Sequence, residues 1–178
     1  MFELPNPLHP AIVHVPIVLA FLGTLFAFVS IFTRRLWLPL YTAIILVLAA
    51  VGAKLATVAG DAQESLFSTL TSEQKELVEE HSQWGDNVLI ALIVAAVLSL
   101  IALGLHRFGI RRIVAILTTL AALVACFFVL RAAQLGGHLV YQHGIGVQNV
   151  PAAEASPSAS PEASPSASQA ASATPTAQ

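Results

Sequence analysis

The sequence predicts an all-α fold: a bundle of four helices that each cross a membrane. Two observations carry this prediction. Of the 178 residues, 56% are hydrophobic and only 10% are charged, and the apolar residues are gathered into four long runs. A soluble domain of this length could not bury so much apolar surface, because small folds leave a large share of their area in water. In lipid, helices pair every backbone polar group within the segment, whereas open strands do not.

Each apolar run is long enough to be a transmembrane helix, which needs about 20 residues. The expected spans cover about residues 11–33, 36–59, 87–105 and 113–135. Ser72 is expected to begin a separate short helix that ends at Glu80 on the membrane surface. Gly136 and Gly137 are expected to end the fourth span, because glycine commonly follows the last turn of a helix. No internal repeat is evident in the sequence.

The composition changes abruptly near the end of the chain. From Pro151 to Gln178 the residues are mainly Ala, Ser and Pro, and none is an aliphatic residue larger than Ala. Such a segment cannot bury a core. The sequence therefore predicts a transmembrane domain over residues 1–147 and a disordered tail over residues 148–178.

Arginines mark the loop between the first and second helices and the loop between the third and fourth. These residues are Arg34, Arg35, Arg107, Arg111 and Arg112. Because cytoplasmic loops are enriched in Lys and Arg, the sequence predicts a multi-pass protein of the cell membrane with these loops in the cytoplasm. Both termini, the acidic loop over residues 60–86 and the tail are then expected outside. The expected partner is the lipid bilayer, and the net charge of −2 gives no indication of a nucleic-acid partner.

Most of the histidines fall at one predicted face of the membrane. Those on the outer face are His9, His14, His81, His138 and His143. A single interfacial histidine is usually a hydrogen-bonded polar tip, whereas a gathering of this size indicates a site. His14 lies within an apolar run, and an ionisable residue there is a functional candidate.

Two cations lie in the outer parts of apolar helices. Lys54 is in the second span and Arg131 is in the fourth. Long basic side chains in such places extend to the membrane surface. The alternative is that they neutralise anions near the histidines, and heme propionates are anions of this kind.

Two terminal motifs resemble a known family. The stretch LHPAIVHVPI, from Leu8 to Ile17, is similar to its HPxxVHxPI opening, and LGGHLVYQHGIGV, from Leu135 to Val147, is similar to its GGxLVYxHGxGV closing. The family also has a histidine before the third helix, and His81 is similarly placed in this sequence. The family is the predicted-membrane-protein family called domain of unknown function 2231, and the resemblance covers about residues 4–147. It implies four membrane helices and no established activity. Its pattern matches His9, His14, His81 and His143, and leaves His138 at a variable position.

The histidine layer leads to a first hypothesis, a b-type heme protein that acts as an electron-transfer or redox subunit with a redox partner protein. Low-spin heme takes two imidazoles, one on each side of the iron. His14 with His81 or His143 is expected to supply them, with Arg131 and Lys54 near the propionates. The sequence contains no CxxCH motif, so covalent attachment is not expected.

Two alternatives remain open. Copper or zinc would be held by imidazoles of His9, His14, His81 and His143, with a carboxylate or water completing the site. In the other alternative the protein is non-catalytic, and its histidines bond helices together or sense pH. An enzyme is less expected, because the sequence has no nucleophile elbow, no phosphate-binding glycine loop and no carboxylate pair within the helices.

Overall fold

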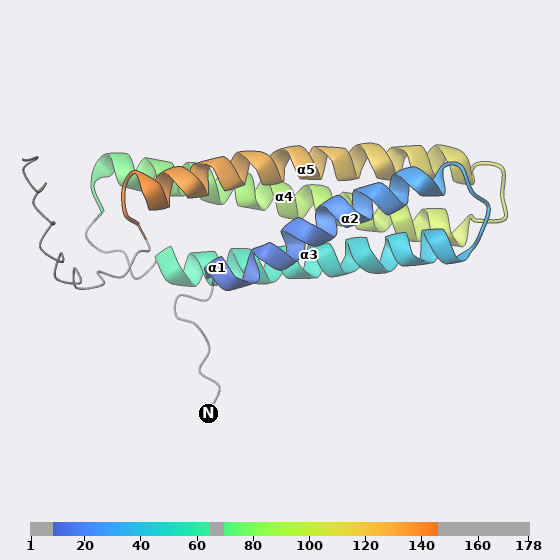
Figure 1. Ribbon diagram of the computed structural model, residues 1–178, viewed down its shortest axis with the longest axis horizontal. Coiled ribbons are helices and arrows are strands. Elements are labelled where there is room, and N and C mark those ends of the chain that lie inside the picture. The colour runs from blue at the N-terminus through green and yellow to red at the C-terminus, as the bar shows by residue number, and fades with distance from the viewer. Residues whose placement is uncertain (1–8, 65–69, 146–178) are drawn as a thin grey trace, which may run out of the picture. The chain divides into compact units, whose positions relative to one another are not determined.

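The computed structural model describes residues 9–64 and 70–145, and within them it contains helices and no strands. The helices are α1 (His9–Ile12), α2 (His14–Ser30), α3 (Trp37–Glu64), α4 (Ser72–Gly104) and α5 (Arg111–Tyr141), as Figure 1 shows. Four helical stretches, the first made of α1 and α2 together, are long and apolar enough to cross a membrane. The predicted fold class is confirmed. The predicted tail lies outside the described residues.

The helices alternate in direction and form a closed ring of neighbours. Helix α2 packs on α3 and α5, and α4 also packs on α3 and α5. The starts of α1 and α4 and the ends of α3 and α5 therefore share one end of the bundle, seen on the left in Figure 1. We call it the histidine end, after His9, His14, His81, His138 and His143. The opposite end holds residues 31–36 and 105–110, and we call it the arginine end, after Arg34, Arg35, Arg107, Arg111 and Arg112.

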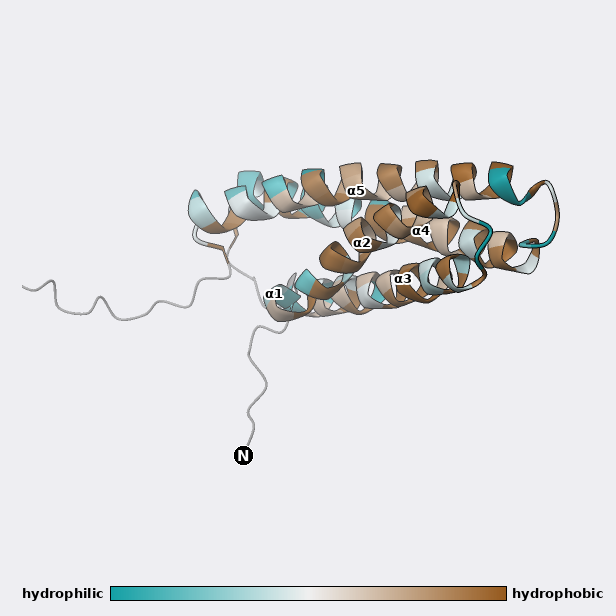
Figure 2. Cartoon of the chain, turned by 45° about the vertical axis from the view of Figure 1, so that its right-hand side comes forward, coloured by the Kyte–Doolittle hydropathy of each residue, from teal (hydrophilic) through white to brown (hydrophobic). Residues whose placement is uncertain are grey.

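The outer surface of the bundle is apolar and its interior is built from small residues. Large side chains such as Leu120 and Phe127 are exposed, whereas many of the most deeply buried positions are alanine. Figure 2 shows the apolar colour along the helices between the two ends. Because lipid tails are as apolar as leucine, helices associate in a membrane through close packing, which small residues allow.

Helix α4 is longer than the sequence predicts. The short helix expected from Ser72 to Glu80 and the span expected over 87–105 are one continuous helix, because no residue between them interrupts the backbone. A capping box starts it: the Thr71 hydroxyl accepts from the Gln74 N–H, and the Gln74 side chain accepts from the Thr71 N–H.

Helix α5 also continues beyond its predicted end at residue 135. It runs through Gly136 and Gly137 to Tyr141, so the prediction that these glycines end it is wrong. The turn that follows it contains Gly144, which has the positive φ of 64° that favours glycine and donates its N–H to the carbonyl of Val140. The polar half of α4 and the last turns of α5 together extend past α1 and α2 in Figure 1.

The two helical hairpins, α2–α3 and α4–α5, repeat each other. The buried residues of α2 are Pro16, Ala20, Gly23, Ala27 and Ser30. When these positions are shifted along the chain by one fixed number of residues, they fall on buried residues of α4, which are Val88, Leu92, Ala95, Ser99 and Ala102. A second constant offset relates α3 to α5, where the buried positions Leu38, Pro39, Thr42, Ala43, Leu46, Ala49 and Ala53 match Val114, Ala115, Thr118, Thr119, Ala122, Ala125 and Val129.

Hydrogen bonds follow the same correspondence. The Thr42 hydroxyl donates to the Leu38 carbonyl and the Thr118 hydroxyl donates to the Val114 carbonyl, both at 2.9 Å. Since α2 and α4 have the same neighbours, a half-turn about the bundle axis exchanges the two hairpins. The repeat is not evident in the sequence because equivalent positions share burial and seldom share identity.

One contact distinguishes the hairpins. Gly23 has no Cβ, and a Cβ placed there would lie 2.6 Å from Cδ2 of Leu46, which is 0% exposed. The equivalent pair in the other hairpin is Ala95 and Ala122, which pack in the same cluster as Leu46. The missing methyl at Gly23 therefore makes room for the large side chain of Leu46.

We predict that Gly23→Ala destabilises the bundle by about 1–3 kcal/mol through overpacking, and that this cost disappears in a Leu46→Ala background. Reversible unfolding in detergent measures the free energies of both single variants and the double variant. Gly85→Ala is the control, since a Cβ at Gly85 meets nothing within 4 Å. A Gly23→Ala variant as stable as the control would contradict the packing.

Candidate functional site

Two histidines from different hairpins meet at the histidine end. The ring centroids of His9 and His81 are 6.3 Å apart, and the ring planes are inclined at 83°. His9 begins α1, and His81 lies in the polar part of α4. They are equivalent under the offset that relates α2 to α4, so the half-turn that exchanges the hairpins also exchanges these two rings.

Each ring is held by the backbone of the other helix in its own hairpin. Nδ1 of His9 donates to the carbonyl of Ala56 at 2.7 Å, and Nδ1 of His81 donates to the carbonyl of Ala132 at 3.0 Å. A carbonyl only accepts, so in both rings Nδ1 carries the proton. The neutral imidazole then keeps its lone pair on Nε2, which is the arrangement found in metal-binding histidines.

Both rings rest on a glycine one helical turn beyond the accepting carbonyl. A Cβ placed on Gly60 would lie 3.2 Å from Cε1 of His9, and one placed on Gly136 would lie 3.1 Å from Cε1 of His81. These distances are tighter than ordinary van der Waals contact. Helices α3 and α5 therefore carry the same short motif, Ala-x-x-x-Gly, as the seat for an imidazole.

Aromatic residues lie next to the pair on α4 and α5. Trp84 lies one turn after His81, close to Phe127 and Phe128, and the Arg131 guanidinium lies 5.4 Å from the centre of its ring. Tryptophan is enriched at membrane interfaces. From Trp84 to the end of α4, the helix rises about 30 Å, the thickness of a bilayer core. His81 lies one turn before this stretch of α4.

The other predicted histidines do not join the pair. His14 and His138 are exposed, and His143 is half-buried in the turn after α5. Across residues 9–64 and 70–145, no three side chains of His, Cys, Asp or Glu form a group able to hold a metal ion. The structure thus brings together two of the predicted ligands, His9 and His81.

The two predicted cations lie on the helices that seat the rings. Lys54 is exposed on α3, two residues before Ala56. Arg131 directly precedes Ala132 on α5, where it covers the Trp84 ring and donates from Nη1 to Oε1 of Gln134 at 2.9 Å.

Sequence reasoning missed the backbone half of the site. Ala56 and Ala132 contribute carbonyls, and Gly60 and Gly136 contribute the absence of a side chain. The only available signal was the recurrence of Ala-x-x-x-Gly near the ends of two apolar runs, a spacing that is common in membrane helices.

Four membrane-spanning helices and a pair of backbone-anchored imidazoles define a multi-pass integral membrane protein with a histidine site at one end. The chain belongs to the family described as "Predicted membrane protein (DUF2231)", which matches residues 5–149. This match confirms the resemblance found in the sequence. The description names a membrane protein and no activity. No curated protein and no solved structure was found to match the chain.

We predict that Gly136→Ala destabilises the protein by about 1–2 kcal/mol relative to Gly137→Ala, because the added methyl pushes the His81 ring off the Ala132 carbonyl. Gly137 is the matched control, as a Cβ there meets nothing within 4 Å. Unfolding in detergent gives the stabilities, and nitrogen NMR of labelled histidine reports the Nδ1 hydrogen bond. Equal stability and an equal Nδ1 hydrogen-bond signal in the two variants would contradict the close contact between Gly136 and the His81 ring.

Proposed function

We propose that the chain is a b-type heme protein of the membrane, in which His9 and His81 would hold the heme. The observation that supports this most directly is the equivalence of the two rings. Each is fixed through Nδ1 to a carbonyl and leaves Nε2 for a ligand. A site on the axis that exchanges the hairpins suits a ligand that both halves bind in the same way.

The spacing of the rings agrees with this role. With metal–nitrogen bonds of about 2 Å, two imidazoles on opposite sides of one metal ion have ring centres about 6 Å apart. The ring centres of His9 and His81 are 6.3 Å apart.

The number of ligands favours heme over zinc or copper. A structural zinc site takes four protein ligands, and among the described residues no group of even three is present. Heme iron receives four nitrogens from the porphyrin and needs only two from the protein. Four-helix bundles build such cofactor sites from side chains on facing helices.

Two imidazoles supplied by the chain also indicate electron transfer. Held by them, the heme would supply a redox centre. The pair lies at the membrane boundary, where a partner protein in the aqueous phase can approach. Arg131, which directly precedes Ala132, and Lys54 on α3 would be the cations that neutralise the propionates.

The optical spectrum of protein purified in detergent after expression with added heme tests this proposal. The expected result is the Soret band and the sharp reduced α-band of low-spin heme, lost on His9→Ala and on His81→Ala. His14→Ala and His138→Ala are matched controls that keep the bands, because both residues are exposed.

Absence of a Soret band from the folded wild-type protein would overturn the proposal. One equivalent of copper or zinc without porphyrin would assign the pair to metal binding. A double His9→Ala/His81→Ala variant with unchanged bound metal and unchanged spectra would leave the rings only a structural role.

We also propose that the arginine end faces the cytoplasm, on the basis of its five arginines. In a Cys126→Ser background, cysteine placed at Phe108 or at Tyr141 reports the two ends, since both side chains are exposed. A membrane-impermeant maleimide added to intact cells is expected to label Tyr141→Cys and to spare Phe108→Cys until the cells are opened. The reverse pattern would contradict the orientation.

A further inference from the structure

We propose that the arginine end binds the headgroups of anionic phospholipids. Four arginines are exposed there, namely Arg34, Arg35, Arg107 and Arg112. The sequence has no Asp or Glu in residues 30–60 or 87–118, and neither α3 nor α5 has an acidic residue in its first turn. The positive charge of this end therefore has no counter-charge in the protein nearby.

A fifth arginine draws the two loops together. Arg111, at the start of α5, is only 8% exposed, and its Nη1 donates to the carbonyls of Ser30 at 2.9 Å and Thr33 at 2.6 Å. These bonds tie the end of α2 to the start of α5. They bring the residues that follow Thr33 close to the residues on either side of Arg111.

Arg111 thereby combines two weakly basic loops into one strongly basic surface. Arg34 and Arg35 directly follow Thr33, while Arg112 directly follows Arg111. The N–H of Arg111 also donates to the carbonyl of Phe108, which holds the turn that carries Arg107. We define the basic surface as the four exposed arginines and treat Arg111 as its support.

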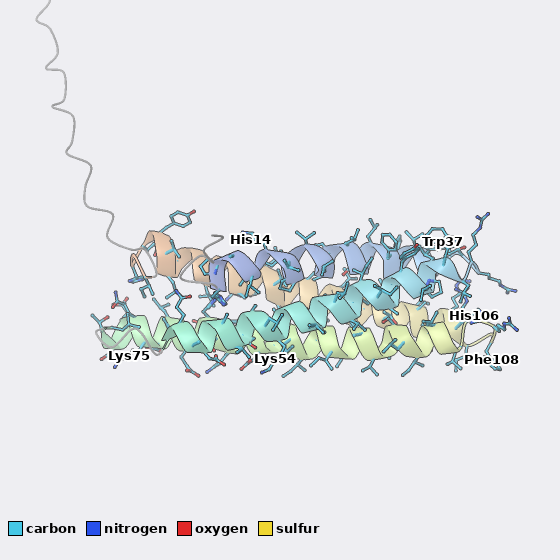
Figure 3. All side chains as sticks on the ribbon, turned by 90° about the horizontal axis from the view of Figure 1, so that it is seen from below. His14, Trp37, Lys54, Lys75, His106 and Phe108 are labelled. Carbon is cyan, nitrogen blue, oxygen red and sulfur yellow. The ribbon has the colours of Figure 1, made fainter. Side chains whose placement is uncertain are left out.

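Exposed aromatic side chains surround the basic surface and identify its surroundings as the lipid headgroup layer. Trp37 and Tyr41 stack edge to face with centroids 6.1 Å apart, and Phe32 and Phe108 are 68% and 62% exposed. Figure 3 shows Trp37 and Phe108 at the same end of the bundle. Such aromatic belts mark the headgroup level. Arginine at that level meets phosphate, with which its planar guanidinium makes paired hydrogen bonds.

The partner inferred from this chemistry is a lipid whose phosphate is not neutralised within its own headgroup. A zwitterionic lipid carries a compensating ammonium, whereas phosphatidylglycerol does not. Each basic residue near an anionic membrane surface contributes about fivefold in affinity. The four arginines together are therefore expected to enrich anionic lipid strongly around this end.

Native mass spectrometry of the full chain, released from nanodiscs of equal parts phosphatidylglycerol and phosphatidylcholine, tests the proposal. The test variant replaces with glutamine the four residues Arg34, Arg35, Arg107 and Arg112. The wild-type protein is expected to retain phosphatidylglycerol at least tenfold over phosphatidylcholine, and the test variant is expected to lose this preference. The control variant Lys75→Gln removes an exposed cation at the other end and is expected to keep it.

Two double variants, Arg34→Gln/Arg35→Gln and Arg107→Gln/Arg112→Gln, keep the test decisive if the fourfold variant fails to fold. Each is expected to lose part of the preference. An unchanged preference in both, or equal retention of the two lipids by the wild type, would overturn the proposal. So would displacement of phosphatidylglycerol by an equal concentration of inorganic phosphate, since the ligand would then be a soluble anion.

Discussion

Close backbone packing in lipid is the constraint on which the rest of this structure depends. Water drives large apolar side chains together, but lipid does not, so the helices adhere where small residues let them approach. The deepest positions, among them Ala20, Ala49 and Ala95, are accordingly small, and the large side chains face outward. Because the interior is tight, a single larger side chain such as Leu46 requires a glycine opposite. The same closeness brings the carbonyls of Ala56 and Ala132 within reach of imidazoles on neighbouring helices.

The repeat of the two hairpins explains why the histidine pair is so regular. His9 contacts α3 in the same way that His81 contacts α5, because a carbonyl and a glycine one turn apart recur at equivalent positions. The two rings, one from each hairpin, form a pair that neither hairpin has alone. The pair therefore depends on the association of the hairpins, and a change that shifts one against the other disturbs both rings.

Much of the fold could be predicted from the sequence, because the length and number of apolar runs determine how many times a chain crosses a bilayer. The site could be predicted only in part. The apolar run around His14 predicts a functional role for it, yet its side chain is exposed, whereas His9 lies in the paired site. The hydrogen bond to the backbone carbonyl of Ala56 holds His9 in the pair. Every residue has a backbone carbonyl, so the sequence does not indicate which one binds a histidine. The prediction that Gly136 ends α5 is wrong for a related reason. Glycine both ends helices and allows another side chain to pack closely, and only the contact with His81 distinguishes the two roles.

The separation of charge along the bundle has an electrical consequence. Arginines without counter-charges occupy one end, while the exposed face of α4 at the other end carries Glu73, Glu76 and Glu79. The molecule is thus a dipole along the membrane normal. A transmembrane potential acts on each transferred charge with about 2.3 kcal/mol per 100 mV. A membrane that is negative on the arginine side therefore favours this orientation of the protein over the opposite one.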